Sequence, residues 1–292
     1  MTFARTAIAS LLLGLTLATQ AADAPPLPAN HGKVDARLFL GDGPRQPLIV
    51  GFGGAEGDNL FAKPQMKPAV DGFLAQGYSF LAIGYFDAPG APKELDRIAL
   101  EGVHAAIETA ARDPKVNKDC IAVLGGSMGG ELSLLLASHY RDIKAVVGLV
   151  PGSAVFPAHT SRMDTASFSF DGRPLPFVPL PQSAVPYLLK RELRSAWDEM
   201  MKDEAAVQKA SIEVERINGP ILLISATQDE FWPSTGMSER VVRRLAARKF
   251  AYEVRHVAVE GRHDAGYTRP DLTDAFLKAN LLDQSAAGCP RR

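Results

Sequence analysis

Short apolar runs alternate with longer amphipathic segments along most of the chain. The apolar runs predict strands at residues 36–40, 47–52, 78–85, 121–124, 144–150, 220–225 and 250–259. The segments between them, with apolar residues at helical spacing, predict helices at 66–76, 95–112, 131–140, 234–247 and 271–282. Strands that alternate with helices in this way are typical of a mostly parallel central sheet with helices on both faces. The pattern therefore predicts an α/β fold.

One stretch interrupts this alternation after the strand that ends near Val150. Residues 151–194 are rich in proline, serine and aromatic side chains and show no clear period. A loop of this length inside a compact domain is usually functional, so we expect a lid over a substrate site. No repeat or linker divides the remainder, and residues 25–292 are predicted to form a single domain.

The first residues read as an export signal. Arg5 precedes an apolar run at 7–18, and small residues follow it. This pattern predicts a signal peptide at residues 1–21, with cleavage after Ala21 or Ala24. The run is too short to span a bilayer comfortably and no later stretch reaches that length, so we expect a periplasmic or secreted protein without a membrane span.

The cysteines, the overall charge and the spacing of metal-binding residue types limit which cross-links, partners and metals are expected. An oxidising compartment would permit a disulfide between Cys120 and Cys289, but the sequence leaves open whether they lie within bonding distance. The net charge of −1 and the lack of a basic run argue against a nucleic-acid partner. No His or Cys cluster has metal-ligand spacing, so no metal is expected. The oligomeric state is not predicted.

The segment from 121 to 130, IAVLGGSMGG, predicts a strand, a sharp turn and a helix start with Ser127 at the apex. In such a nucleophile elbow the serine has a strained backbone, and glycines two residues before and after let the strand and helix cross closely. Gly125 and Gly129 occupy these two positions. Ser127 is therefore the predicted nucleophile.

Two later strands end in residues that would activate this serine. Asp229 follows the strand at 220–225, and His263 follows the strand at 250–259. A serine hydroxyl needs a base within hydrogen-bond reach and an acid that orients the base. Open α/β sheets place their sites at this strand edge, and the chain order serine, acid, histidine is typical of elbow enzymes. We predict a triad of Ser127, Asp229 and His263.

Other residues compete for two of these roles. Glu230, next to Asp229, is the alternative orienting acid. The remaining histidines are predicted to be surface or packing residues, although His159 in the lid segment is also a candidate for substrate contact. These five are His31, His104, His139, His159 and His256.

Acyl transfer also needs N–H donors for the oxyanion of the tetrahedral intermediate. Met128, directly after the nucleophile, is the first predicted donor. The second is expected from the glycine-rich loop at 51–57, with Ala55 as the first choice and Gly54 as the next. The same loop resembles a dinucleotide fingerprint, but Glu56 stands where the third glycine should be. No nucleotide or other cofactor is therefore expected.

The chain from about 47 to about 282 resembles the α/β-hydrolase superfamily. Within it, the motifs at 53–57 (GGAEG), 125–132 (GGSMGGEL) and 217–234 are similar to the catalytic domain shared by acyl-coenzyme A thioesterases and bile acid-coenzyme A:amino acid N-acyltransferases, a domain similar to dienelactone hydrolases. The resemblance implies an α/β-hydrolase fold with the triad on Ser127, Asp229 and His263. Serine at the nucleophile position is similar to the hydrolytic branch, since the aminoacyltransferase branch typically carries cysteine.

Eukaryotic relatives carry a β-sandwich domain before the catalytic one, and the room before Pro47 suggests that this domain is absent. We expect a serine hydrolase that cleaves a small acyl ester or thioester through an acyl-enzyme. Alternatives on the same triad are an exported carboxylesterase or lactonase and an acyltransferase. A binding module without activity is disfavoured, because it has little reason to keep all these residues together. In the lid, we expect either an acyl pocket or core packing for five aromatic residues, which are Phe156, Phe168, Phe170, Phe177 and Tyr187.

Overall fold

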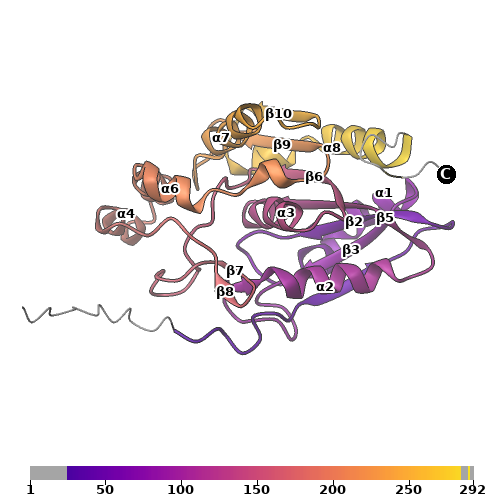
Figure 1. Ribbon diagram of the computed structural model, residues 1–292, viewed down its shortest axis with the longest axis horizontal. Coiled ribbons are helices and arrows are strands. Elements are labelled where there is room, and N and C mark those ends of the chain that lie inside the picture. The colour runs from indigo at the N-terminus through magenta and orange to yellow at the C-terminus, as the bar shows by residue number, and fades with distance from the viewer. Residues whose placement is uncertain (1–24, 284–288, 290–292) are drawn as a thin grey trace, which may run out of the picture.

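The computed structural model describes residues 25–283 and residue 289, and its centre is a seven-stranded sheet (Figure 1). The strand order is β1-β3-β2-β5-β6-β9-β10, and every neighbouring pair is parallel except β1 with β3. The strands of this sheet are β1 (Asp35–Phe39), β2 (Gln46–Phe52), β3 (Ser79–Gly84), β5 (Val116–Gly126), β6 (Ile143–Leu149), β9 (Ile221–Ala226) and β10 (Val254–Val259).

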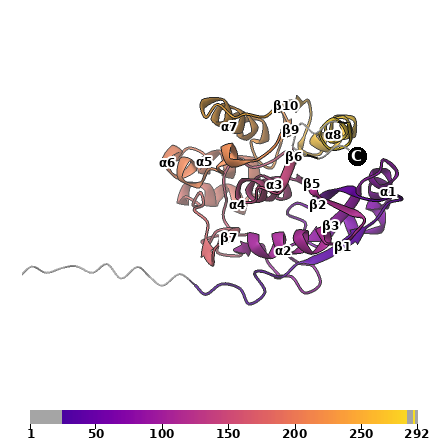
Figure 2. The same ribbon diagram turned by 45° about the vertical axis from the view of Figure 1, so that its right-hand side comes forward.

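Helices cover both faces of this sheet (Figures 1 and 2). Helices α1 (Lys67–Ala75) and α8 (Pro270–Leu277) pack on one face, and a π-helical turn at Lys278–Asp283 continues α8. Helices α2 (Leu100–Ala111), α3 (Met128–His139) and α7 (Ser234–Ala247) pack on the other. Every residue of β2, β3 and β9 is buried, which explains why these strands read as continuous apolar runs rather than alternating ones.

The predicted helix at 95–112 was wrong at its start. Helix α2 begins only at Leu100, because Ile98 and Ala99 form a short strand, β4, that pairs with β7 (Phe168–Phe170). Strand β8 (Arg173–Pro174) completes this second, three-stranded sheet. Pairing between segments so far apart in sequence overrides the local helical pattern.

The segment at 151–194 is more ordered than its composition indicates. Besides β7 and β8 it contains α4 (Val185–Leu189) and the first residues of α5 (Leu193–Met200), after which α6 (Glu204–Ala210) follows. This segment and the two helices lie at the left of Figure 1, beside the carboxyl ends of the strands that carry the candidate site.

The two cysteines form a disulfide between Cys120 on β5 and Cys289 near the C-terminus. This answers the question that the sequence left open. The predicted signal peptide at 1–21 lies outside the described residues. Within the described part of the chain, no helix has the length and apolar character needed to cross a bilayer.

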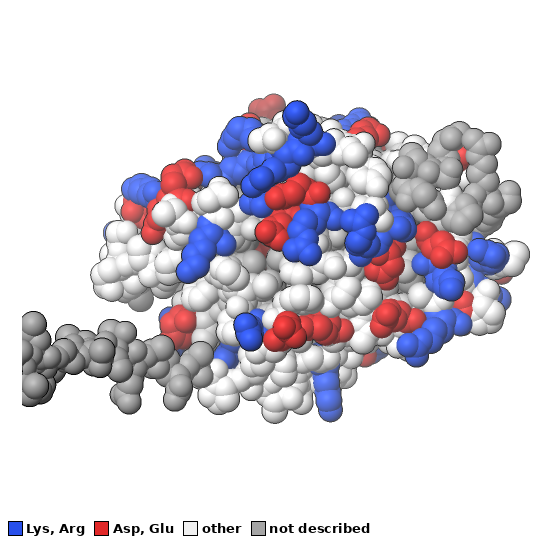
Figure 3. All heavy atoms as spheres, viewed as in Figure 1, with Lys and Arg blue, Asp and Glu red and all other residues white. Residues whose placement is uncertain are grey.

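Charged side chains of both signs are interspersed on the face shown in Figure 3. The basic side chains of α7 illustrate this mixing. Arg240 pairs with Glu204, Arg243 with Glu239 and Arg244 with Glu215. The helix therefore carries its arginines beside acidic partners rather than as a single-sign field.

Candidate active site

The turn between β5 and α3 has the backbone of a nucleophile elbow. Ser127 has φ 54° and ψ −120°, a conformation that costs free energy for any residue with a side chain. A Cβ on Gly125 would lie 2.0 Å from the carbonyl oxygen of Gly129, and one on Gly129 would lie 2.3 Å from that of Gly53. Both glycines are therefore required for the close crossing, as the sequence predicts.

The second predicted donor loop lies directly against the elbow. A Cβ on Gly54 would lie 3.1 Å from that of Ser127. The Gly54 N–H already donates to Glu56 Oε1 at 3.0 Å, whereas the Ala55 N–H has no acceptor among the described residues. Met128 is the first residue of α3, so its N–H has no partner within the helix. Met128 and Ala55 therefore remain as the available pair of donors.

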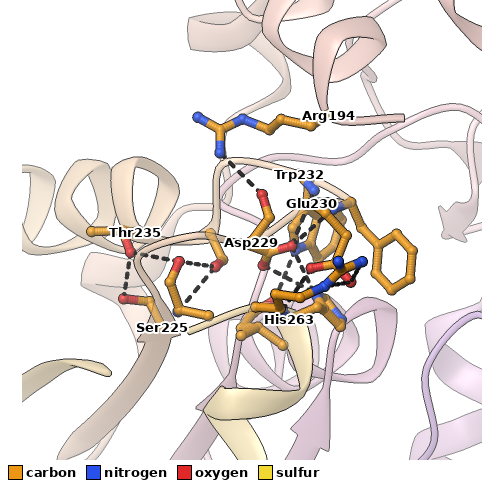
Figure 4. Close-up of polar contacts among 12 residues, drawn as sticks. Arg194, Ser225, Asp229, Glu230, Trp232, Thr235 and His263 are labelled. Carbon is orange, nitrogen blue, oxygen red and sulfur yellow. Dashed lines mark hydrogen bonds and ion pairs between the residues drawn. The ribbon is translucent and has the colours of Figure 1, made fainter. Parts of the chain in front are cut away.

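The predicted acid and base are hydrogen-bonded to each other (Figure 4). His263 Nδ1 lies 2.9 Å from both carboxylate oxygens of Asp229, and both side chains are almost fully buried. Burial alone would raise the pKa of Asp229, but hydrogen bonds from His263 and Ser234 lower this pKa below its usual value. Asp229 is therefore an ionised acceptor that holds the Nδ1 proton and leaves Nε2 free to act as a base.

Glu230, the alternative acid, serves the backbone instead. Its Oε2 accepts the N–H of His263 at 2.9 Å, and its Oε1 accepts from Arg262 Nη2 at 2.9 Å. Arg194 donates to the backbone carbonyl of Asp229 at 3.1 Å. Glu230 thus fixes the turn that presents His263, while the imidazole ring itself bonds to Asp229.

Ser127 and His263 face one cavity of about 410 Å³, which we call the aromatic cavity. Among the described residues the Ser127 hydroxyl has no hydrogen-bond partner, so the shared cavity is what relates it to the base. Aromatic and apolar side chains form most of the wall, with Trp197 and Trp232 buried and Phe231 and Tyr267 partly exposed. The lining residues are Ala55, Glu56, Ser127, Met128, His159, Leu193, Trp197, Phe231, Trp232, His263 and Tyr267.

None of the five lid aromatics lines the aromatic cavity. Phe156 and Phe168 are fully buried in the main core, and Phe170, Phe177 and Tyr187 pack against it. Of the two fates expected for them, core packing is correct. The aromatic residues that do line the cavity follow the predicted lid or the strand that carries the acid. Among them, Trp232 donates a hydrogen bond from Nε1 to the Val150 carbonyl at 3.0 Å, which fixes its ring in the wall.

The sequence contained signals for these missed residues. Phe231 and Trp232 directly follow the acid pair, and Tyr267 follows His263 by about one helical turn. Trp197 lies on α5 with Ala196 and Met200, an apolar pattern with helical spacing just beyond the end of the predicted lid.

Four of the remaining histidines make structural contacts, as expected. His256 Nε2 lies 2.8 Å from Ser225 Oγ, and His104 Nε2 lies 2.9 Å from Asp142 Oδ2. His31 and His139 contact backbone carbonyls. His159 differs because it lines the aromatic cavity, where burial lowers its pKa and its Nε2 has no partner among the described residues.

Glu131 on α3 is a fully buried carboxyl group behind the elbow. Burial raises its pKa well above the usual value, and its Oε1 accepts a long hydrogen bond of 3.5 Å from Ser167. Within residues 25–283 and residue 289, no group of His, Cys, Asp and Glu side chains is arranged to share a metal ion.

Residues 98–265, more than half of the chain, match the model of a family described as BAAT / Acyl-CoA thioester hydrolase C terminal. The chain belongs to this family. It is 26% identical to mouse acyl-coenzyme A thioesterase 1 over 222 residues, which cover 76% of this chain and 49% of the relative. It is 27% identical to mouse peroxisomal succinyl-coenzyme A thioesterase over 233 residues, with the same coverage of 76% and 49%. The chain thus spans about half the length of these curated relatives.

Solved structures support the α/β-hydrolase fold of this family member. A puromycin-hydrolyzing peptidase of Mycobacterium tuberculosis aligns with a TM-score of 0.59 at 18% identity, covering 89% of this chain and 38% of the peptidase. Est1E of Butyrivibrio proteoclasticus, solved with ferulic acid, aligns with a TM-score of 0.53 at 21% identity, covering 87% and 96%. At these identities the likeness concerns the fold alone.

Proposed function

We propose that this protein is a serine hydrolase that cleaves an acyl thioester or ester through an acyl-enzyme on Ser127. The observation that carries the proposal is the convergence of Ser127, Met128 and His263 on one cavity, with Asp229 bonded to the far nitrogen of His263. Membership of a thioester hydrolase family supports the same reaction class.

The reaction follows from the position of each group. His263 Nε2 takes the proton of Ser127 as Oγ bonds to the acyl carbon, and the N–H groups of Met128 and Ala55 stabilise the oxyanion. The intermediate collapses by breaking the C–S or C–O bond, and the leaving group takes the proton from His263. A water molecule then repeats the sequence and releases the carboxylic acid. Hydrogen bonds to a catalytic serine are often formed only when substrate binds, which is consistent with the unpaired hydroxyl.

The names of the relatives favour a coenzyme A thioester as the substrate. A specific observation favours a simple ester as the second candidate, because none of the described residues lining the aromatic cavity is Lys or Arg. Coenzyme A carries several phosphate charges, for which Arg and Lys are the usual ligands. The nearby Arg194 and Arg262 are engaged with Asp198 and Glu230. We also propose, from the N-terminal sequence, that the protein acts after export.

The test compares one acyl group presented as a coenzyme A thioester and as an aryl ester. We expect Ser127-dependent turnover of at least one, with the Ser127→Ala variant as the control. A higher kcat/KM for the thioester would support the thioesterase assignment, and a higher value for the ester would support the carboxylesterase. Equal rates in wild type and Ser127→Ala for both substrates would contradict the proposal.

A further inference from the structure

A second cavity of about 370 Å³ lies on the other side of the elbow from the aromatic cavity, under helices α1 and α8; we call it the α1–α8 cavity. Apolar side chains form most of its wall, and several of them are only half-buried because they face this space. These apolar residues are Phe52, Leu60, Phe61, Met66, Phe73, Leu124 and Leu149. Its volume falls within the range of about 300–1,000 Å³ that is typical of small-molecule sites.

The α1–α8 cavity reaches the proposed reaction centre. Its wall includes Gly125 and Gly126, the two residues of the elbow that directly precede Ser127. Glu56 and Tyr267 line both cavities and form the partition between them. A Cβ on Gly126 would lie 2.4 Å from the Tyr267 ring, so this ring rests directly on the elbow. Ser127 lines only the aromatic cavity, but its neighbour Gly126 lines the α1–α8 cavity, so a substrate bonded to Ser127 lies beside the partition between the two.

The position of His263 decides which part of the substrate enters which cavity. His263 lines the aromatic cavity and is not among the residues lining the α1–α8 cavity. The leaving group must receive its proton from His263, which places it on the aromatic side. The other substituent of the acyl carbon then extends away from His263.

From this allocation we propose that the α1–α8 cavity binds the acyl chain of the substrate, and that the chain is aliphatic. This inference rests on the proposed serine hydrolase function. The apolar wall removes methylene groups from water, while the polar and charged side chains of Arg269, Thr273 and Asp274 lie on the α8 side. Each methylene that becomes buried in the transition state should raise kcat/KM about fourfold.

The experiment uses the full-length chain and p-nitrophenyl esters from acetate to decanoate. In wild type, kcat/KM should rise from acetate to octanoate. Met66→Trp fills the cavity from the α1 side, and Thr273→Phe fills it from α8. Each should lower the octanoate-to-acetate ratio of kcat/KM at least tenfold. Gln65→Trp is the matched control, because Gln65 is the exposed neighbour of Met66 and does not line the cavity.

Several results would overturn the inference. The first is an unchanged ratio in folded Met66→Trp and Thr273→Phe, with folding checked by thermal unfolding. The second is loss of the octanoate preference in Leu193→Trp, which fills the aromatic cavity instead. If neither filling variant folds, the ester series in wild type is the remaining test. A wild-type kcat/KM that does not rise from acetate to octanoate also contradicts the inference. Absence of any Ser127-dependent turnover of these esters and of the coenzyme A thioester would instead refute the proposed function itself.

Discussion

Replacement of Asp229 by asparagine tests whether Asp229 is the residue that orients His263. The asparagine carbonyl can still accept the hydrogen bonds from the N–H groups of Phe231 and Trp232, whose nitrogens lie 3.0 and 3.3 Å from Asp229 Oδ1. Its amide group then faces His263 Nδ1 as a donor and favours the tautomer whose proton is on Nε2. That tautomer cannot accept the serine proton, and in triad enzymes this change lowers kcat by about 10⁴-fold. The loss corresponds to about 5.4 kcal/mol of transition-state stabilisation.

Glu230→Gln is the matched control for this substitution. The glutamine carbonyl still accepts the His263 N–H, and the change removes only the charge paired with the exposed Arg262. An exposed pair of this kind contributes up to about 1 kcal/mol to folding stability. Even if all of it bore on the position of His263, kcat would fall less than about fivefold. The assay is steady-state ester hydrolysis by both folded variants. A loss in Glu230→Gln as large as that in Asp229→Asn would refute the assignment of the acid.

Three further predictions concern stability. Gly125→Ala should lower the free energy of unfolding by about 1–3 kcal/mol or more in urea titration, since its Cβ would overlap the Gly129 carbonyl. Burial raises the pKa of Glu131 in the fold, so its contribution to stability should fall as pH rises above the unfolded value of about 4.5. The stability of Glu131→Gln relative to wild type should therefore increase with pH, and parallel stability-against-pH curves for the two would contradict this. Reduction of Cys120–Cys289, 169 residues apart, should cost about 2–4 kcal/mol in unfolding midpoint measurements, and no shift with reductant would contradict this.

The sequence predicted the elbow and its partners because their signals are local. Gly125 and Gly129 are fixed by the short spacing that a strand–turn–helix crossing requires, and Asp229 and His263 each follow a buried apolar strand. Parallel strands bring their carboxyl ends to one edge of the sheet, so residues far apart in sequence meet there without any further information. The order of elements and the main strands were predictable for the same reason.

The cavity walls were less predictable because they depend on contacts between distant segments. Apolar character alone does not indicate whether Phe156 faces a cavity or, as the structure has it, the core. The start of α2 was misplaced because Ile98 pairs with Phe168 on β7, a contact that no local window contains. Trp197 lies on a helix whose pattern is visible in the sequence, but its proximity to Ser127 depends on the path of the whole segment between β6 and β9.

Covalent labelling shows directly whether Ser127 is an activated nucleophile. The full-length protein would be treated with a fluorophosphonate, and the adduct located by mass spectrometry of the intact chain and its peptides. We expect one adduct, on Ser127, which disappears in Ser127→Ala and forms far more slowly in His263→Ala. An unlabelled wild-type Ser127, or labelling at the same rate without His263, would contradict it.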